Sequence, residues 1–212
     1  MNAAAWSCFG IAAGFAVLDW YAVVTERRVL EYVAKPSAAL AFLATAIALD
    51  PVHPDTRVWF CVALAWCVAG DVFLMLPRDA FVPGLASFLV AQLCFAVGFA
   101  LQARSATSVA VGVAVVAVVA LPIASRFVRA LTAEGHRSLV PPVIAYVTAI
   151  GAMVATAVAS GNAVAVVGAG LFLVSDALIG ETRFVRARPG APLAIIVTYH
   201  LALAGLVFSL VT

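Results

Sequence analysis

Eight long apolar segments, each almost free of charged side chains, limit the folds open to this chain more than any other feature. They cover about residues 3–24, 32–49, 58–76, 81–101, 107–131, 139–160, 163–180 and 191–211. Most contain about 18 to 25 residues, enough for a helix rising about 1.5 Å per residue to cross a hydrocarbon core of roughly 30 Å. The sequence therefore predicts an all-α integral membrane protein with eight transmembrane helices.

Composition places the chain in the same class. Hydrophobic residues make up 66% of it and charged residues 10%, with a mean hydropathy of +1.15, whereas a soluble domain has about 25% charged residues. The connections are too short to fold alone, so we expect a single polytopic membrane domain over residues 1–212. The first segment lacks a preceding basic region and a small-residue cleavage site, which indicates a retained span and not a signal peptide.

The basic residues predict an orientation. Ten of the twelve lie in or beside the connections after the first, third, fifth and seventh segments: Arg27, Arg28, Lys35, Arg78, Arg126, Arg129, Arg137, Arg183, Arg186 and Arg188. Only Arg57 and Arg104 lie on the other side. The positive-inside rule then puts these four connections in the cytoplasm and both termini outside, in a plasma or inner membrane. Because the cations are dispersed and the net charge is only +2, no nucleic-acid partner is expected.

Two aspartates interrupt apolar segments. Asp71 and Asp176 are 105 residues apart (176 minus 71), and each follows a small residue and precedes apolar residues that lead to a loop. An aspartate near the centre of a membrane helix costs roughly 2.5 to 3.5 kcal/mol, so a chain that keeps two of them needs a reason. We predict that Asp71 and Asp176 are the paired catalytic carboxylates of an active site.

Six further polar residues are predicted to surround these carboxylates and bind substrate. They are Asp19, Lys35 and Tyr146, near the same end of their segments, and Gln92, Tyr199 and His200, deeper, as the floor of a cavity. Each has a structural alternative: a polar side chain can simply hydrogen-bond a neighbouring helix, a lysine can extend to headgroups, and a histidine can serve in packing. In the predicted orientation the site faces the cytoplasmic leaflet.

The positions of the polar residues also indicate two four-helix halves. Asp71 in the third segment corresponds to Asp176 in the seventh, and Gln92 in the fourth corresponds roughly to His200 in the eighth, at offsets of 105 to 108. An even number of spans in each half gives parallel repeats, which would place both aspartates on the same side of the membrane.

Metal, redox and serine chemistry are not indicated. The four cysteines fall in apolar segments without CxxC spacing, and no HExxH pair occurs. Asp50, His53 and Asp55 are interrupted by two prolines and indicate a turn, and Ser175 lacks a GxSxG elbow. We therefore expect no metal and no cofactor. The sequence leaves the oligomeric state open.

Four stretches resemble the YhhN-like lysoplasmalogenase family. They are Lys35-Pro36 at the start of the second segment, Gly70-Asp71-Val72-Phe73-Leu74-Met75-Leu76-Pro77, Phe81-Val82-Pro83-Gly84-Leu85-Ala86-Ser87-Phe88, and Phe172-Leu173-Val174-Ser175-Asp176-Ala177-Leu178-Ile179. The resemblance spans nearly the whole chain. It implies hydrolysis of the vinyl ether bond of lysoplasmalogens, giving a fatty aldehyde and glycerophosphoethanolamine or glycerophosphocholine.

The residues suit that chemistry. Vinyl ether hydrolysis begins with proton transfer to the β-carbon, and water then captures the resulting oxocarbenium ion. One aspartate could donate the proton while the other, ionised, stabilises the cation and orients water; the sequence does not say which. Lys35 could attract the lipid phosphate or hold one aspartate ionised, and membrane lipids would flank the alkenyl chain.

Two other classes stay open at this stage. A small secondary transporter could use the carboxylates to bind a proton or a cation, although transporters tend to place such groups at the membrane midplane beside broken helices. Pro122 and the pair Pro141-Pro142 keep that alternative open. A purely structural membrane protein would not need two buried carboxylates.

Overall fold

The computed structural model describes residues 1–76 and 80–212. Within them the chain forms eight helices that are long and apolar enough to cross a membrane. The helices are α1 (Ala3–Val24), α2 (Arg28–Ala48), α3 (Pro54–Met75), α4 (Phe81–Ala100), α5 (Ala106–Ala133), α6 (Val140–Ser160), α7 (Ala163–Phe184) and α8 (Ala191–Phe208). Two short 3₁₀ turns, η1 (Arg137–Leu139) and η2 (Ser209–Val211), extend α6 and α8. The predicted all-α membrane fold with eight spans is confirmed.

Local signals fix where the helices begin. Ser105 and Ser108 form a reciprocal capping box at the start of α5, and the Asn162 side chain accepts from the backbone of α7. Pro54 begins α3 at a position where its missing N–H needs no acceptor. Three helices pass beyond the predicted apolar segments: α2 begins at Arg28, α3 begins at Pro54 and α7 ends at Phe184. Their polar end turns continue the helix because backbone hydrogen bonding does not stop where apolar composition stops.

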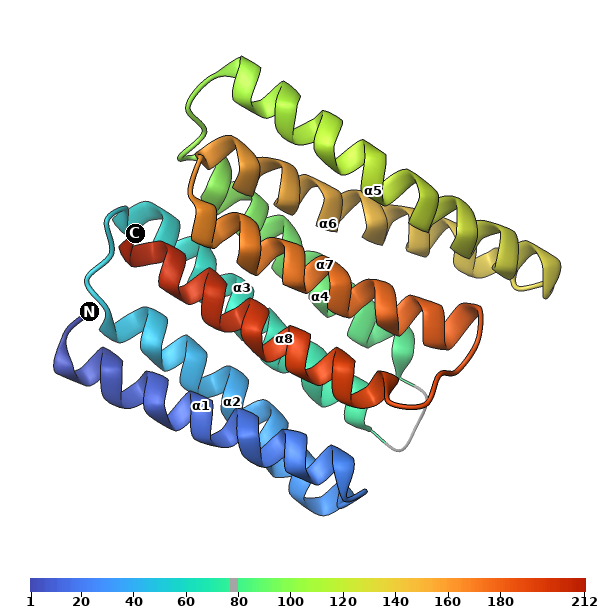
Figure 1. Ribbon diagram of the computed structural model, residues 1–212, viewed down its shortest axis with the longest axis horizontal. Helices are drawn as coiled ribbons and strands as arrows, with labels where there is room; N and C mark the ends of the chain where they lie inside the picture. Colours follow the sequence, from blue (N-terminus) through green and yellow to red (C-terminus); the bar gives the residue numbers. More distant parts are fainter. Residues whose placement is uncertain (77–79) are drawn as a thin grey trace.

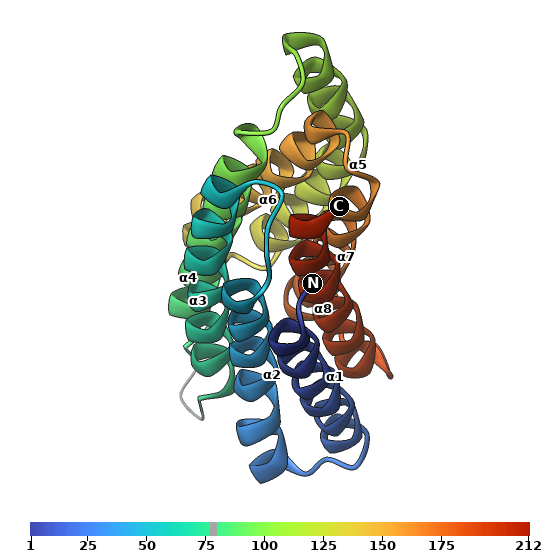
Figure 2. The same ribbon diagram turned by 90° about the vertical axis from the view of Figure 1, so that its left-hand side faces the viewer.

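Six helices form a closed ring, and two lie outside it. Around the ring, α2 contacts α3, α3 contacts α4, α4 contacts α6, α6 contacts α7, α7 contacts α8, and α8 returns to α2. Figure 2 shows α2, α3 and α4 on one side of the bundle and α1, α7 and α8 on the other. Outside the ring, α1 packs on α2 and α8, while α5 packs on α6 and α7. Each half of the chain thus gives one outer helix and three ring helices, as two repeats would require.

Glycines bring two ring helices into close contact. A Cβ atom on Gly168 of α7 would lie 2.8 Å from the backbone nitrogen of Leu206, and one on Gly205 of α8 would lie 2.9 Å from the Cα of Gly168. Small residues allow membrane helices to approach in this way, and packing then takes the place of a hydrophobic driving force. The contact fixes α7 and α8, which carry Asp176 and Tyr199, relative to one another.

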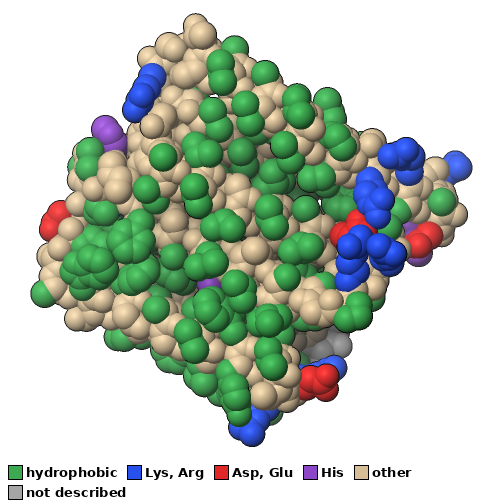
Figure 3. All heavy atoms as spheres, viewed as in Figure 1, with side chains coloured by type: hydrophobic (Ala, Val, Ile, Leu, Met, Phe, Trp, Pro, Cys, Tyr) green, Lys and Arg blue, Asp and Glu red, His purple; other side chains and the backbone are tan. Residues whose placement is uncertain are grey.

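The connections from α1 to α2, α5 to α6 and α7 to α8 lie at one end of the bundle, opposite both termini (Figure 1). Seen from the same side, many of the Lys and Arg side chains gather at that end (Figure 3). Pro77, Arg78 and Asp79, a predicted loop, lie outside the described residues. The side of the membrane that this end faces stays a prediction.

Candidate active site

Asp71 lies at the centre of a buried ion pair. It is four residues before the last residue of α3, and its side chain is 1% exposed. Lys35 Nζ of α2 lies 3.6 Å from its Oδ1, and the Tyr199 hydroxyl of α8 donates to its Oδ2 at 2.8 Å. We call Lys35, Asp71 and Tyr199 the first carboxylate set. Its aspartate therefore faces a cation and a neutral donor.

Lys35 lies deeper than the sequence suggested. The segment that was expected to open with Lys35 and Pro36 begins at Arg28, so Lys35 is seven residues inside α2 (35 minus 28). The polar first turns of α2 extend beyond the apolar segment, and Pro36 remains within the helix. Lys35 is consequently 14% exposed and reaches Asp71, which agrees with the alternative that it holds an aspartate ionised.

Asp176 has only neutral partners among its recorded contacts. The Tyr146 hydroxyl of α6 donates to Asp176 Oδ2 at 2.6 Å, and Gln92 Nε2 of α4 donates to the same oxygen at 2.7 Å. We call Tyr146, Asp176 and Gln92 the second carboxylate set. Both donors converge on Oδ2 and leave the other oxygen, Oδ1, outside these two hydrogen bonds.

The two sets repeat one arrangement. In each, the aspartate comes from the third helix of a half, one partner from the second helix of that half, and the other partner from the fourth helix of the opposite half. Each of the six ring helices supplies one member: Lys35, Asp71, Gln92, Tyr146, Asp176 and Tyr199. The residue that occupies the position equivalent to Gln92 is Tyr199 (offset 107, 199 minus 92). The predicted match of Gln92 with His200 is wrong by one residue, which on a helix is a rotation of about 100°.

Asp19 and His200 form a separate group with Trp20. The Trp20 indole Nε1 donates to His200 Nδ1 at 3.0 Å, and His200 Nε2 lies 3.9 Å from Asp19 Oδ2. We call these residues the Asp19 set; it lies between α1 and α8, and Asp19 and His200 are both buried. Sequence reasoning did not select Trp20, although its position next to Asp19 was a usable signal. The substrate contact expected of Asp19 and His200 stays a prediction.

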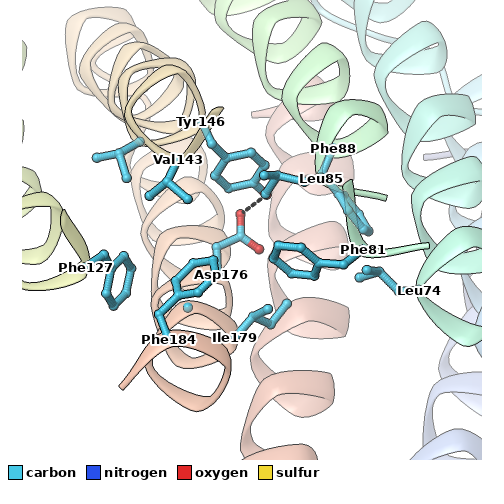
Figure 4. Close-up of a pocket in the computed structure, with 12 residues that line it drawn as sticks. Leu74, Phe81, Leu85, Phe88, Phe127, Val143, Tyr146, Asp176, Ile179 and Phe184 are labelled. Carbon is cyan, nitrogen blue, oxygen red and sulfur yellow. Dashed lines mark hydrogen bonds between the residues drawn. The ribbon is translucent and has the colours of Figure 1, made fainter. Parts of the chain in front are cut away.

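A narrow apolar pocket leads to the second carboxylate set. It lies among α3, α4, α5, α6 and α7 and has a free volume of about 40 Å³. Of the twelve described residues that line it, Asp176 alone is acidic or basic, and Tyr146 is the other polar one. Figure 4 shows the Asp176 carboxylate among the rings of Phe81, Phe127 and Phe184. The volume is enough for water but not for a long hydrocarbon chain.

A larger groove of about 550 Å³ opens beside the first set. It lies between α2 and the start of α8, and its charged lining residues are Glu26, Arg28, Glu31 and Lys35. With two acidic and two basic side chains, the lining of this groove has no net formal charge. Asp71 itself does not line this groove, because Lys35 stands between them.

Residues 1–76 and 80–212 contain no cluster of potential metal ligands and no disulfide bond. No three His, Cys, Asp or Glu side chains of this part are grouped as metal ligands would be. The four cysteines are free, and Cys67 and Cys94 are buried. The polar side chains that do meet are suited to proton transfer and to hydrogen bonding.

Comparisons with known proteins identify the family of this chain. The sequence profile of the YhhN family matches residues 30–210. Proteins named lysoplasmalogenase from Mycobacterium bovis (strain ATCC BAA-935 / AF2122/97) and Mycobacterium tuberculosis (strain CDC 1551 / Oshkosh) are each 34% identical to this chain over 166 residues, which is 76% of this chain. The chain spans 63% of the length of these relatives. No solved structure matches. Because the family profile matches most of the chain, residues 30–210, this protein belongs to the YhhN family.

Proposed function

We propose that this protein hydrolyses the vinyl ether bond of lysoplasmalogens, with release of a fatty aldehyde and glycerophosphoethanolamine or glycerophosphocholine. Membership of the YhhN family supports the reaction, as does the fact that the two relatives are named lysoplasmalogenase. The observation that carries the proposal is the second carboxylate set: a carboxyl group with two neutral donors on one oxygen, at the wall of an apolar pocket that opens between membrane helices.

Asp176 is the proton donor in this proposal. A buried carboxyl group without a counter-charge carries a proton more readily than one beside a cation. Asp71 has Lys35 at 3.6 Å, whereas the recorded partners of Asp176 are a phenol and an amide. This difference in partners is our reason for choosing between the two aspartates, a choice that the sequence left open.

The reaction proceeds in three steps. The proton on Asp176 Oδ1 passes to the β-carbon of the alkenyl group, the C=C electron pair forms the new C–H bond, and an oxocarbenium ion results. Water adds to the carbon bonded to oxygen and returns a proton to the Asp176 carboxylate. The hemiacetal then collapses to the aldehyde and the glycerol hydroxyl. Tyr146 and Gln92, which donate to Oδ2, stabilise the carboxylate that exists between the first two steps.

Asp71 is the second, ionised carboxylate of the proposal. Its partner Tyr199 packs edge to face against Phe88 at a ring-centroid distance of 5.8 Å, and Phe88 lines the pocket of Asp176. The fixed charges of the first set thus lie behind one wall of the pocket. We assign Asp71 an electrostatic role toward the cation and the water, with Lys35 and Tyr199 holding its carboxylate in place.

The test is release of fatty aldehyde from 1-alkenyl lysophosphatidylethanolamine by the detergent-purified protein. Asp176→Asn and Asp71→Asn are measured beside the wild type, with Asp55→Asn in the exposed first turn of α3 as a matched control. The proposal expects aldehyde from the wild type and the control, and its loss in folded Asp176→Asn. A folded wild type supplied with lipid that releases no aldehyde would refute it, and proton flux in liposomes would then test the transporter class.

A further inference from the structure

A groove between α5 and α7 carries an arginine pair that the proposed reaction does not use. Arg126 Nε and Nη2 donate to the two carboxylate oxygens of Glu181 at 2.8 and 2.7 Å, and Arg188 Nη2 donates to Glu181 Oε1 at 3.3 Å. The groove that these residues line has a volume of about 290 Å³. We call it the arginine groove.

The arginine groove has an excess of positive charge and N–H donors that Glu181 does not use. Two guanidinium groups share one carboxylate, which leaves a formal charge of +1. A guanidinium has five N–H groups, and Glu181 occupies two of them in Arg126 and one in Arg188. The side chains of Arg126 and Arg188 are 51% and 50% exposed, while that of Glu181 is 15% exposed. Glu181 therefore orients both guanidinium groups without cancelling their combined positive charge. This arrangement suits binding of a phosphate.

We place the arginine groove at the level of the lipid headgroups. At 28 residues, α5 is about 42 Å long, which exceeds a hydrocarbon core of roughly 30 Å. Arg126 is on the last third of α5, and Arg188 is in the loop after α7. Figure 3 shows Lys, Arg and acidic side chains gathered at this end of the bundle. The rest of the groove is apolar, including Ile123, Val174 and Leu178.

A continuous lining connects the arginine groove to Asp176. Ile123, Phe127 and Ala177 line both the groove and a small space of about 30 Å³ that Asp176 and Tyr146 also line. Glu181 is five residues after Asp176 on α7, a rise of about 7.5 Å. In a lysoplasmalogen roughly seven bonds of about 1.5 Å separate phosphorus from the β-carbon of the vinyl ether, or roughly 9 Å when extended. A phosphate on the arginines would thus leave the β-carbon close to the level of Asp176 along α7.

The groove beside Lys35 is a poorer match for a phosphate. Lys35 is paired with Asp71, and Glu26 and Glu31 offset the two cations that line that groove. The sequence suggested Lys35 as a contact for the lipid phosphate. Because Lys35 is paired with Asp71, a different cation has to make that contact. We propose that Arg126 and Arg188 bind the phosphate of the lysophospholipid whose alkenyl group reaches Asp176. This inference rests on the proposed function and names the groups that select its substrate.

Binding of an inert analogue tests the inference without catalysis. The ligands are 1-alkyl lysophosphatidylethanolamine, which has no vinyl ether, and 1-alkylglycerol of the same chain length, which has no phosphate. Affinity is measured for the full chain in detergent by native mass spectrometry. Arg188→Gln is the main variant, because Arg188 lies in a loop and its contact with Glu181 is the longer one. Arg129→Gln is the matched control, since Arg129 of α5 contacts Ser125 of the same helix.

We expect Arg188→Gln to weaken binding of the phospholipid about tenfold, as loss of a charge-assisted hydrogen bond predicts, and to leave alkylglycerol binding unchanged. Arg188→Lys should recover part of the loss, and Arg129→Gln should show none. Equal affinity of wild type and Arg188→Gln for the phospholipid would overturn the inference. So would displacement of the lipid by millimolar inorganic phosphate, which would identify a site for the free anion.

The same variants separate this inference from the proposed function. If wild type binds the phospholipid through Arg188 but releases no aldehyde from the alkenyl substrate, the reaction is refuted and the phosphate site stands. If wild type releases aldehyde and Arg188→Gln has an unchanged KM for alkenyl lysophosphatidylethanolamine, the phosphate site is refuted and the reaction stands. A raised KM with kcat retained supports both.

Discussion

The two carboxylate sets share an arrangement but differ in charge. Each aspartate of the ring receives a hydrogen bond from the fourth helix of the opposite half, Tyr199 to Asp71 and Gln92 to Asp176. The second helix of the same half gives Lys35 to Asp71 but Tyr146 to Asp176. The second-helix partner is thus a cation in one set and a neutral donor in the other, and the fourth-helix partner is a tyrosine in one and a glutamine in the other. Repetition supplies the geometry, and the lysine in the first set alone is the difference on which the two proposed roles rest.

Removing the acid of the second set should have the largest effect. Asp176→Asn cannot donate a proton to carbon, and general acid catalysis contributes about a hundredfold to ten-thousandfold. We expect aldehyde release to fall by about a thousandfold, with the unfolding temperature close to that of wild type. If Asp71→Asn lost more activity than Asp176→Asn while remaining folded, the assignment of roles to the two sets would be reversed.

Removing the cation of the first set should cost stability. Lys35→Met leaves the Asp71 carboxylate buried without its ion-pair partner, and breaking a buried pair costs about 3 kcal/mol or more. Thermal unfolding in detergent measures the loss. The double variant Lys35→Met with Asp71→Asn should regain most of it, because no charge then remains. A double variant as unstable as the single one would show that Lys35 acts through packing alone.

The two tyrosines provide a matched pair. Tyr146→Phe removes a donor to Asp176 Oδ2, and a hydrogen bond to a charged group is worth about 1.5 to 3 kcal/mol, so kcat should fall about tenfold or more. Tyr199→Phe removes the tyrosine donor to Asp71 and should lower kcat less. Steady-state aldehyde release measures both variants. Equal losses would mean that the two sets contribute alike to the chemical step.

The Asp19 set should have the smallest effect. Trp20→Phe keeps an aromatic ring but removes the donor to His200 Nδ1, a loss of about 1 kcal/mol in unfolding free energy. Aldehyde release should match that of wild type. A fall in kcat of tenfold or more in the folded variant would bring Asp19 and His200 into the active site, as the sequence suggested.

The sequence was sufficient to predict the eight membrane-spanning helices and to select most of the polar residues that contact one another inside the bundle. Intramembrane charge is costly, so Asp71 and Asp176 could be selected without a structure. Their partners could not be assigned, because partners depend on which helices become neighbours. Tyr199 and His200 show the limit: they are adjacent in the chain, yet one contacts Asp71 and the other lies 3.9 Å from Asp19. A rotation of about 100° around the helix decides between the two sites, and the apolar composition around these residues does not indicate it.

The arginine groove was missed for a different reason. The sequence argument used Arg126 and Arg188 only to predict the orientation of the helices in the membrane. That prediction depends on the side of the membrane on which each arginine lies, and not on its contacts. That they meet at Glu181 depends on α5 lying against α7. No spacing in the sequence indicates that contact, because the residues come from different helices and a loop.

Because α5 lies outside the ring, we expect the pocket to respond to bilayer thickness. Phe127 of α5 lines the pocket, and α5 packs mainly on α6 and α7, so widening the pocket requires displacement of one helix while both carboxylate sets stay assembled. A helix of about 42 Å in a core of roughly 30 Å relieves hydrophobic mismatch by tilting. Its tilt, and with it the separation of Phe127 from α7, follows the thickness of the surrounding membrane. Lipid composition would thereby set how readily a substrate chain enters, with no ligand bound to the protein.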